Sequence, residues 1–203
     1  EINSIPTIDA GSDTVICLSD TVTLTATGSA TSFTWNNNIT NGVGFIPLAS
    51  NQYIVIGTDF NSCTNSDTVN VSVTNLSIDA GPDAEICYGE SVVLTATGPN
   101  PLWSQGVLDG VSFNPDSTLT YTLTISDSNG CVNTDSVLVT VFDLPNVMAP
   151  NDTVVCNGDE IQLLASGANN YDWDNGYFNG ELFMPDNSGY HIVTGIDSNS
   201  CEN

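Results

Sequence analysis

Apolar and polar residues alternate along much of this chain with a period of two. In residues 21–27 the apolar side chains of Val22, Leu24 and Ala26 fall on one face, and threonines fall on the other. Such alternation is typical of an antiparallel sheet with one buried and one solvated face. The same pattern recurs in four further segments: 69–73, 91–97, 137–141 and 160–166. Clusters of Gly, Asn, Asp and Pro separate the strands every ~8 to 12 residues, so the pattern predicts an all-β fold.

The alternating strands belong to a motif that occurs three times. Each copy begins with a cysteine, reaches a tryptophan 16 to 18 residues later, and continues with Gly-x-x-Phe-x-Pro and an aromatic strand before a second cysteine. The first cysteines, the tryptophans and the second cysteines are, in order, Cys17, Cys87 and Cys156; Trp35, Trp103 and Trp173; and Cys63, Cys131 and Cys201. The first cysteine recurs after 70 and then 69 residues. A period of this length indicates a tandem array of small domains.

We expect three domains: repeat 1 over residues 1–75, repeat 2 over 76–144 and repeat 3 over 145–203. Residues 1–7 are expected to be a linker or the tail of a preceding repeat. Repeat 3 is expected to lack its last strand, because only Glu202 and Asn203 follow its second cysteine.

Each repeat is predicted to be a seven-stranded immunoglobulin-like β-sandwich. In repeat 1 the expected strands are A over 8–17, B over 21–27, C over 31–36, E over 43–48, F over 52–58 and G over 67–74, with a short strand D between C and E. The tryptophan of strand C should fill the core, and the phenylalanine of Gly-x-x-Phe-x-Pro should pack into the core from strand E.

The six cysteines are expected to form disulfides, because a domain of about 70 residues has only a marginal core. The simplest arrangement ties strand A to the start of strand G within each repeat, as Cys17–Cys63, Cys87–Cys131 and Cys156–Cys201. The alternative crosses the domain boundaries, as Cys63–Cys87 and Cys131–Cys156, and leaves Cys17 and Cys201 to outside partners. Both arrangements predict an oxidising, extracellular location. Zinc is not expected, since no two cysteines lie close in sequence.

The charge balance is extreme, because the chain has 24 acidic residues and neither lysine nor arginine. A net charge of −24 repels nucleic acid and anionic membranes, so neither is an expected partner. The composition also excludes a catalytic lysine and an arginine clamp. Two interpretations remain: adaptation to a salty exterior, in which screening weakens self-repulsion, and binding of divalent cations. The first is favoured. No transmembrane run of apolar residues appears, and membrane insertion is not expected.

The segments IDAGPDAEICYGESVVLTATG (78–98) and YTLTISDSNGC (121–131) carry a family resemblance, which residues 8–17 and 24–28 share. They resemble the immunoglobulin-like, PKD-like repeats of giant secreted surface proteins of Bacteroidota. The resemblance implies export by type IX secretion and a role as an adhesin, a gliding-motility surface protein or an extracellular appendage. Fold alone does not determine which of these tasks applies.

Repeat 3 departs from the family pattern in two places. MAPND (148–152) replaces Asp-Ala-Gly-x-Asp, and His191 takes the position of Tyr53 and Tyr121, through either a bulge or a true substitution. As the only histidine, His191 cannot build a triad or a metal site alone, and we expect a core or strand residue. The sequence contains no nucleophile elbow or phosphate loop, so we expect no enzymatic activity.

The motif Asp-x-Asn-x-Cys occurs once in each repeat, beginning at Asp59, Asp127 and Asp197. Its favoured interpretation is turn formation by Asp and Asn side chains. The alternative is calcium bound near the domain junctions, with help from carboxylates of the N-terminal strands. These calcium candidates are Asp9, Asp13, Asp79 and Asp83. No complete calcium-binding loop is present, and no cofactor is expected apart from this candidate calcium.

A string of Asp, then Ser or Thr, then an aliphatic residue or Thr recurs along the chain and resembles the O-glycosylation acceptor pattern of Bacteroidota. Its hydroxyl residues are Thr14, Thr21, Thr68, Ser117, Ser136 and Thr153. A turn aspartate followed by a β-branched strand residue generates the same string without any modification.

These observations together favour a structural segment of a long extracellular adhesin, stalk or filament. Its partners would be neighbouring repeats, other copies in a filament or bundle, and a glycan or cell-surface ligand. One alternative is a glycan- or protein-binding module, and another is an accessory region of a secreted hydrolase. A glycan array or a pull-down would identify a binding module, because a pure spacer binds nothing.

Overall fold

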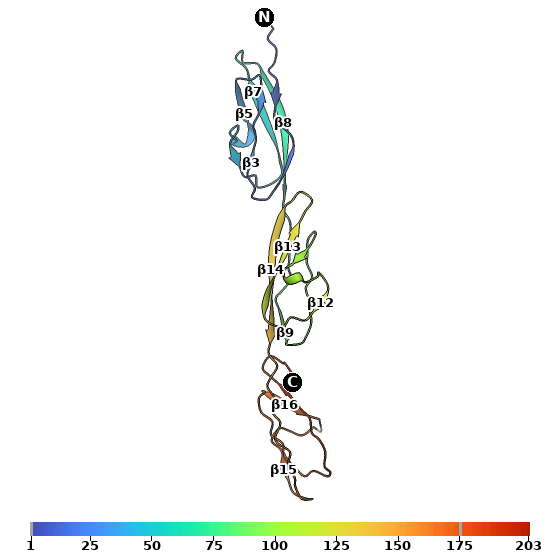
Figure 1. Cartoon of the computed structure of the whole chain (residues 1–203). Coiled ribbons are helices and arrows are strands. Elements are labelled where there is room, and N and C mark those ends of the chain that lie inside the picture. Colours follow the sequence, from blue (N-terminus) through green and yellow to red (C-terminus); the bar gives the residue numbers. More distant parts are fainter. Residues whose placement is uncertain (1, 175) are drawn as a thin grey trace. The chain divides into compact units, whose positions relative to one another are not determined.

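The computed structural model describes residues 2–174 and 176–203, which form short strands joined by turns (Figure 1). The helical elements among these residues are two single 3-10 turns, η1 (Asn36–Asn38) and η2 (Ser104–Gly106). The chain divides into two compact units. Unit 1 holds the chain up to Asp79 together with Thr97–Pro101 and Thr124–Thr134, and unit 2 holds the rest.

Unit 1 contains a four-stranded sheet and a second, smaller layer. The strands of the larger sheet, in spatial order, are β2 (Thr14–Cys17), β8 (Thr64–Thr74), β7 (Asn51–Thr58) and β5 (Ser32–Trp35). The second layer consists of two antiparallel pairs, β1 (Ile8–Asp9) with β4 (Thr27–Gly28) and β3 (Val22–Thr23) with β6 (Gly44–Phe45). This is the arrangement of an immunoglobulin-like sandwich, with strands A, B and E facing strands G, F and C. The predicted fold class is confirmed.

Strand A is not the continuous strand that the sequence predicted over residues 8–17. It breaks at Gly11, where φ is +87°, into β1 and β2. β1 pairs antiparallel with β4, whereas β2 pairs parallel with β8. The chain therefore changes sheets at the break, as strands do at the corners of a sandwich. This parallel pairing decides where the first cysteine of the repeat lies.

Strand B is also shorter than predicted. Leu24 and Ala26 are buried as expected, but their backbone groups bond to a turn instead of a neighbouring strand. The Gly42 N–H donates to the Leu24 carbonyl (2.9 Å), and the Ala26 N–H donates to Oδ1 of Asn41 (2.7 Å). The predicted strand D is wrong, because this region folds as η1 and the turn that follows it.

The core of unit 1 collects inward-facing residues from both layers. Its buried members are Ala10, Val22, Leu24, Ala26, Trp35, Tyr53, Val55, Val69 and Val71. Phe45 packs edge-on against Tyr53 with the ring centroids 5.2 Å apart, and Phe113 packs in the same way against Tyr121 at 5.3 Å. The predicted roles of the tryptophan and of Gly-x-x-Phe-x-Pro in the core are therefore confirmed.

Each buried tryptophan donates its indole N–H to an Asn or Asp six residues later. Trp35 Nε1 lies 3.0 Å from Oδ1 of Asn41, and Trp103 Nε1 lies 3.0 Å from Oδ1 of Asp109. In repeat 3 the acceptor of the Trp173 indole is Asn179. The same acceptor oxygen also takes a backbone N–H from the end of strand B, namely from Ala26, Ala96 and Ala165. One side chain thus satisfies two donors beside the core, which is why a polar residue recurs there.

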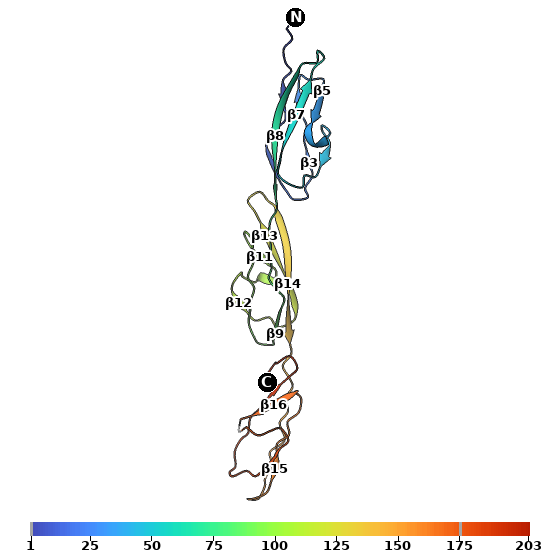
Figure 2. The same ribbon diagram turned by 180° about the vertical axis from the view of Figure 1, so that it is seen from behind.

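Repeat 2 rebuilds the sandwich with the same topology. Its larger sheet has, in spatial order, β11 (Leu102–Trp103), β13 (Leu119–Ser126), β14 (Val132–Phe142) and β9 (Ala84–Cys87). β9 runs parallel to β14, and β10 (Val92–Val93) pairs antiparallel with β12 (Ser112–Phe113). Figure 2 shows β13 and β14 from behind. The tip of the β13–β14 hairpin belongs to unit 1, and the remainder belongs to unit 2.

Repeat 3 has the B–E and C–F pairs but not the last strand. β15 (Ile161–Gln162) pairs with β17 (Leu182–Phe183), and β16 (Asn170–Trp173) pairs with β18 (Val193–Ile196). Only Glu202 and Asn203 continue beyond the last cysteine, and Asn203 exchanges backbone hydrogen bonds with Gly195. Residues 153–156, the counterparts of β2 and β9, form no regular strand.

We predict that replacing Asn41 by alanine destabilises repeat 1. The change leaves the Trp35 indole and the Ala26 N–H without their shared acceptor, at a cost of about 2–4 kcal/mol for two donors. Asn41→Asp is the matched control, because repeat 2 carries Asp109 at this position with both hydrogen bonds intact. Urea denaturation monitored by tryptophan fluorescence measures the difference. Equal midpoints for the alanine and aspartate variants would contradict this role.

Candidate functional site at the inter-repeat disulfides

All six cysteines lie within the described residues, and four of them form disulfides between successive repeats. Cys17 bonds Cys131 with the Cα atoms 5.4 Å apart, and Cys87 bonds Cys201 with the Cα atoms 5.5 Å apart. In both bridges the two cysteines are separated by 114 residues. Cys63 and Cys156 are free thiols. The first cysteine of one repeat therefore joins the second cysteine of the next repeat.

Both pairings considered from the sequence are wrong. The pairs within repeats, Cys17–Cys63, Cys87–Cys131 and Cys156–Cys201, are absent, and so are the boundary pairs Cys63–Cys87 and Cys131–Cys156.

The reason is the direction of β2. Cys17 pairs with Thr74 at the far end of β8, whereas Cys63 comes directly before the first residue of β8. At about 3.3 Å per residue, an 11-residue strand separates its ends by about 33 Å, and a disulfide spans only about 4.4–6.8 Å between Cα atoms. In repeat 2, Cys87 likewise pairs with Phe142 at the far end of β14 from Cys131.

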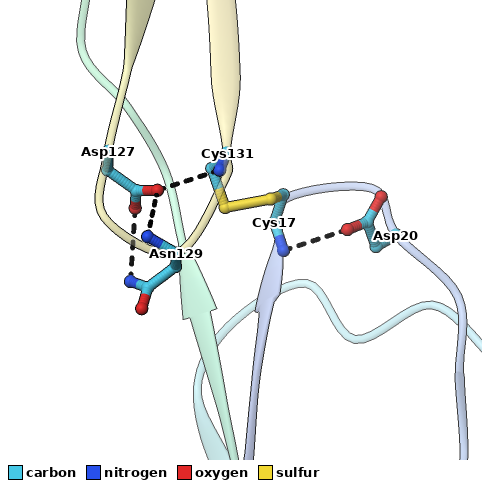
Figure 3. Close-up of a disulfide and its surroundings, with 5 residues drawn as sticks. All are labelled: Cys17, Asp20, Asp127, Asn129 and Cys131. Atoms are coloured by element: carbon cyan, nitrogen blue, oxygen red, sulfur yellow. Dashed lines mark hydrogen bonds between the residues drawn. A yellow bond between two sulfur atoms is a disulfide. The ribbon is translucent and has the colours of Figure 1, made fainter. Parts of the chain in front are cut away.

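The first cysteine of each bridge lies at the start of a tight turn, shown for Cys17 in Figure 3. The Cys17 N–H donates to Oδ2 of Asp20 (3.1 Å), and the Asp20 N–H donates to the Cys17 carbonyl (3.0 Å). Cys87 makes the same two bonds with Glu90, at 2.8 and 3.0 Å. The carboxylate three residues on thus fixes the backbone that presents each sulfur. We call this Cys-x-x-acid turn the presenting half-site.

The second cysteine of each bridge closes a hairpin that an aspartate organises (Figure 3). Oδ1 of Asp127 accepts the N–H groups of Asn129 (2.9 Å) and Cys131 (2.8 Å). Asp197 repeats both bonds with Asn199 and Cys201, at 2.8 and 2.9 Å. The interpretation of Asp-x-Asn-x-Cys as a turn motif is therefore confirmed. We call this hairpin the receiving half-site.

The four calcium candidates are placed on the N-terminal segments of repeats 1 and 2, and their oxygens accept hydrogen bonds. Asp9 accepts the Gly11 N–H (2.9 Å), and Asp83 accepts the Leu138 N–H (2.8 Å). Asp13 accepts the side-chain amide (3.0 Å) and the backbone N–H (2.8 Å) of Asn70, and these bonds hold the pKa of Asp13 below its ordinary value. The carbonyl of the fourth candidate, Asp79, accepts the Thr97 N–H at 3.0 Å.

No group of three or more His, Cys, Asp or Glu side chains within residues 2–174 and 176–203 is arranged to hold a metal ion. Calcium binding remains a prediction.

Two further aspartates, Asp67 and Asp135, tie the N-terminal segment of a repeat to its last strand. The Ala10 N–H donates to Oδ2 of Asp67 in β8 (2.8 Å), and the Ala80 N–H donates to Oδ2 of Asp135 in β14 (2.8 Å). These bonds, with a second one from the following residue, hold the pKa of both carboxyls below the ordinary value. In the sequence both aspartates stood out only as the first residue of the Asp-[Ser/Thr] string, before Thr68 and Ser136, and their role as acceptors was missed.

The six candidate glycosylation residues lie at the surface. Thr14 is half-buried in β2, and the others are exposed: Thr21, Thr68, Ser117, Ser136 and Thr153. Glycosylation remains a prediction for all six positions.

His191 occupies the place of Tyr53 and Tyr121. Of the two explanations left open by the sequence, a bulge and a true substitution, the structure therefore supports the substitution. Its ring lies 5.9 Å from that of Phe183, the counterpart of the Phe45–Tyr53 contact, while Tyr190 is 95% exposed. The His191 Nδ1 lies 3.8 Å from Oδ1 of Asp174. His191 is therefore a packing residue just before strand β18.

No protein-family model matches this sequence, and no curated protein matches it. Similar solved structures include the N-terminal eight Ig domains of Down Syndrome Cell Adhesion Molecule (18% identity, TM-score 0.41, 85% of this chain and 34% of that one). Titin domains I67–I69 are also similar, with 12% identity and a TM-score of 0.41 over 97% of this chain and 90% of that one. The insect immune protein hemolin has 15% identity and a TM-score of 0.42 over 68% of this chain and 47% of that one. This chain thus spans about a third of the first structure and about half of hemolin. Similarity at this level says nothing about what the chain binds.

We predict that cutting the backbone between repeats does not separate the unreduced chain. The chain has no Lys or Arg, so Asn75→Lys creates a single tryptic site in the exposed residues between repeats 1 and 2. After digestion in denaturant, the fragments on either side of residue 75 should stay joined through Cys17–Cys131 and separate only on reduction. Mass spectrometry without and with reductant measures this.

Ser4→Lys is the control for this digestion, because residue 4 lies outside both disulfide loops and its fragment should leave without reductant. Asn146→Lys tests Cys87–Cys201 in the same way. Release of the fragments of Asn75→Lys without reductant would favour pairing within repeats.

We predict that acid weakens repeats 1 and 2 through Asp67 and Asp135. Their pKa values are lower in the folded than in the unfolded chain, so their contribution is complete above the ordinary value near 4 and is lost as the pH falls through the folded value. Asp67→Asn should flatten the decline of the repeat 1 melting temperature between about pH 4 and pH 2. Asp143→Asn removes the same charge from an exposed position and should leave the decline unchanged. A wild-type decline in Asp67→Asn would exclude this contribution.

Proposed function

We propose that this chain is a structural segment of a long extracellular adhesin, stalk or filament, whose repeats are joined by disulfides as well as by the backbone. The observation that carries the proposal is the pairing of the first cysteine of one repeat with the second cysteine of the next. Such a bond adds little to the sandwich of a single repeat. It gives each junction a second covalent connection, which is useful where a chain bears tension.

The two disulfide loops overlap, because Cys87 lies inside the loop closed by Cys17 and Cys131. A pulling force therefore follows residues 1–17, crosses to Cys131, runs back to Cys87 and crosses to Cys201. This route is the shortest covalent path between the two ends of the chain, and the residues outside it carry no tension. The chain can unfold completely and still extend only as far as the short path allows.

An extracellular location agrees with this proposal, because structural disulfides persist in oxidising compartments. The net charge of −24 keeps long chains soluble and apart from nucleic acid. No helix of the described residues is long and apolar enough to cross a membrane. The carboxylates of Asp20, Asp67 and Asp127 accept backbone N–H groups, which supports a structural rather than a catalytic use of these acidic residues. The bacterial origin and the secretion route implied by the family resemblance belong to the same proposal.

We predict that the oxidised chain, pulled between its ends, reaches about a third of the extension of the reduced chain. The shortest covalent path has about 65 residues, or about 23 nm at ~3.5 Å per residue, against about 70 nm for the full chain. Single-molecule force spectroscopy with enzymatically attached handles measures both lengths. A reversible gain of this size on adding reductant is the expected result.

Cys131→Ser is the matched control. It removes the first bridge and lengthens the shortest path to about 90 residues, or about 32 nm. An oxidised wild-type chain that extends as far as the reduced chain would overturn the proposed role of the bridges under tension. Specific binding of a glycan or protein to the wild-type chain, without any difference in extension, would favour the binding-module alternative.

A further inference from the structure

The chain holds three presenting and three receiving half-sites, and the two observed bridges use two of each. The presenting cysteines are Cys17, Cys87 and Cys156, and the receiving cysteines are Cys63, Cys131 and Cys201. Both bridges join a presenting half-site to the receiving half-site 114 residues later. The two thiols left over, Cys63 and Cys156, belong to opposite kinds.

The free presenting half-site has the geometry of the bridged ones. The Cys156 N–H donates to Oδ2 of Asp159 (3.1 Å), and the Asp159 N–H donates to the Cys156 carbonyl (3.1 Å). The third residue of this turn, Gly158, has a φ of +93°, close to the +89° of Gly89 in a bridged turn. Cys156 is exposed. Its turn is therefore formed, and its sulfur is accessible, before any bond is made.

The free receiving half-site is also formed. Oδ1 of Asp59 accepts the N–H groups of Asn61 and Cys63, both at 2.8 Å, and the Asp59 N–H donates to the Cys63 carbonyl (3.0 Å). The bonds within the bridged hairpin that ends at Cys131 have the same partners and differ by at most 0.1 Å. Cys63 is partly exposed, whereas the bridged Cys131 and Cys201 are buried.

We infer that Cys63 and Cys156 are complementary half-sites for further bridges of the same kind. Cys156 takes the receiving hairpin of another repeat, and Cys63 takes the presenting turn of another repeat. The inference rests on the proposed function and names the partner of these two positions. The equivalent cysteines form this bond twice in this chain, with one polarity and one spacing. That polarity excludes Cys63–Cys63 and Cys156–Cys156 as products of the same recognition.

The bond forms by thiol–disulfide exchange with a small disulfide such as oxidised glutathione. The first thiolate displaces one glutathione thiolate and forms a mixed disulfide, and the second thiolate then displaces the other glutathione. Two protein thiols and one oxidised glutathione yield one protein disulfide and two reduced glutathiones. The oxidant accepts both electrons, and the two thiol protons end on the two glutathione thiols.

The opposite half-site can come from a second copy of this chain or from another repeat of a longer chain. The first arm of the test mixes 15N-labelled and unlabelled copies of the 203-residue chain in a glutathione redox buffer, then blocks the remaining thiols with N-ethylmaleimide. Digestion at acidic residues and mass spectrometry identify each cross-link, since trypsin has no site. Random pairing would make half of the cross-links between differently labelled copies Cys63–Cys156. We expect the Cys63–Cys156 fraction of these cross-links to be clearly larger than one half.

Two variants sharpen this arm. Cys63→Ser keeps only the presenting thiol, and Cys156→Ser keeps only the receiving thiol. Mixed together, they should dimerise several-fold faster than either alone. Both keep Cys17–Cys131 and Cys87–Cys201, so their folding and their extension under force should match the wild type. A failure of cross-linking is therefore distinguishable from a failure of the proposed role under tension.

The second arm maps Cys63 and Cys156 in protein isolated from its native source with thiols blocked at lysis. The inference is supported if Cys63 and Cys156 are bonded to cysteines of the opposite kind within one longer chain. If the first arm shows no cross-linking, this result identifies the longer chain as the source of the partner half-site. Pairing of unlike thiols in the first arm identifies a second copy. The inference is overturned if native Cys63 and Cys156 carry N-ethylmaleimide and purified copies pair at random or not at all.

Discussion

The parallel pairing of β2 with β8 is the interaction on which the arrangement of the disulfides depends. It carries Cys17 along the last strand to Thr74, at the end of the repeat, and leaves Cys63 at the start of that strand. Loop entropy does not decide between the pairings, because closing about 115 residues is worth about 5 kcal/mol and closing about 47 residues about 4 kcal/mol. The ~33 Å length of β8 decides the matter.

The absence of Lys and Arg has a second structural consequence. A carboxylate of this chain has only neutral donors and one histidine as partners, so backbone N–H groups take the place that side-chain cations hold in most proteins. Asp20 and Asp127 fix the two halves of a bridge, and Asp67 attaches the N-terminal segment to the last strand. Exposed ion pairs contribute little to stability in any case, so the fold loses little by doing without them. The acidic residues are thus part of the architecture.

Local features of the fold were predictable, whereas the neighbours and directions of strands were not. Alternation identified the buried faces of Val22, Leu24 and Ala26, and the spacing of the copies identified the repeat. Periodicity does not say which strand lies beside another, so the break at Gly11 and the parallel pairing of β2 were missed. Because the position of Cys17 depends on that pairing, the predicted cysteine pairs were wrong. The Asn-Gly or Asp-Gly turn six residues after each tryptophan was visible in the sequence, but its double role as acceptor became clear only from the packing.

Small sandwiches usually place a disulfide within the domain to reinforce a limited core. This chain instead satisfies its tryptophans and strand ends by hydrogen bonds inside each repeat and uses its disulfides between repeats. Because the loops Cys17–Cys131 and Cys87–Cys201 overlap, any single break of the backbone between residues 18 and 200 leaves the two parts covalently joined. Pairing within repeats would protect each domain and leave every linker as a point of failure. The observed pairing protects the linkers, so the continuity of the array is what these disulfides secure.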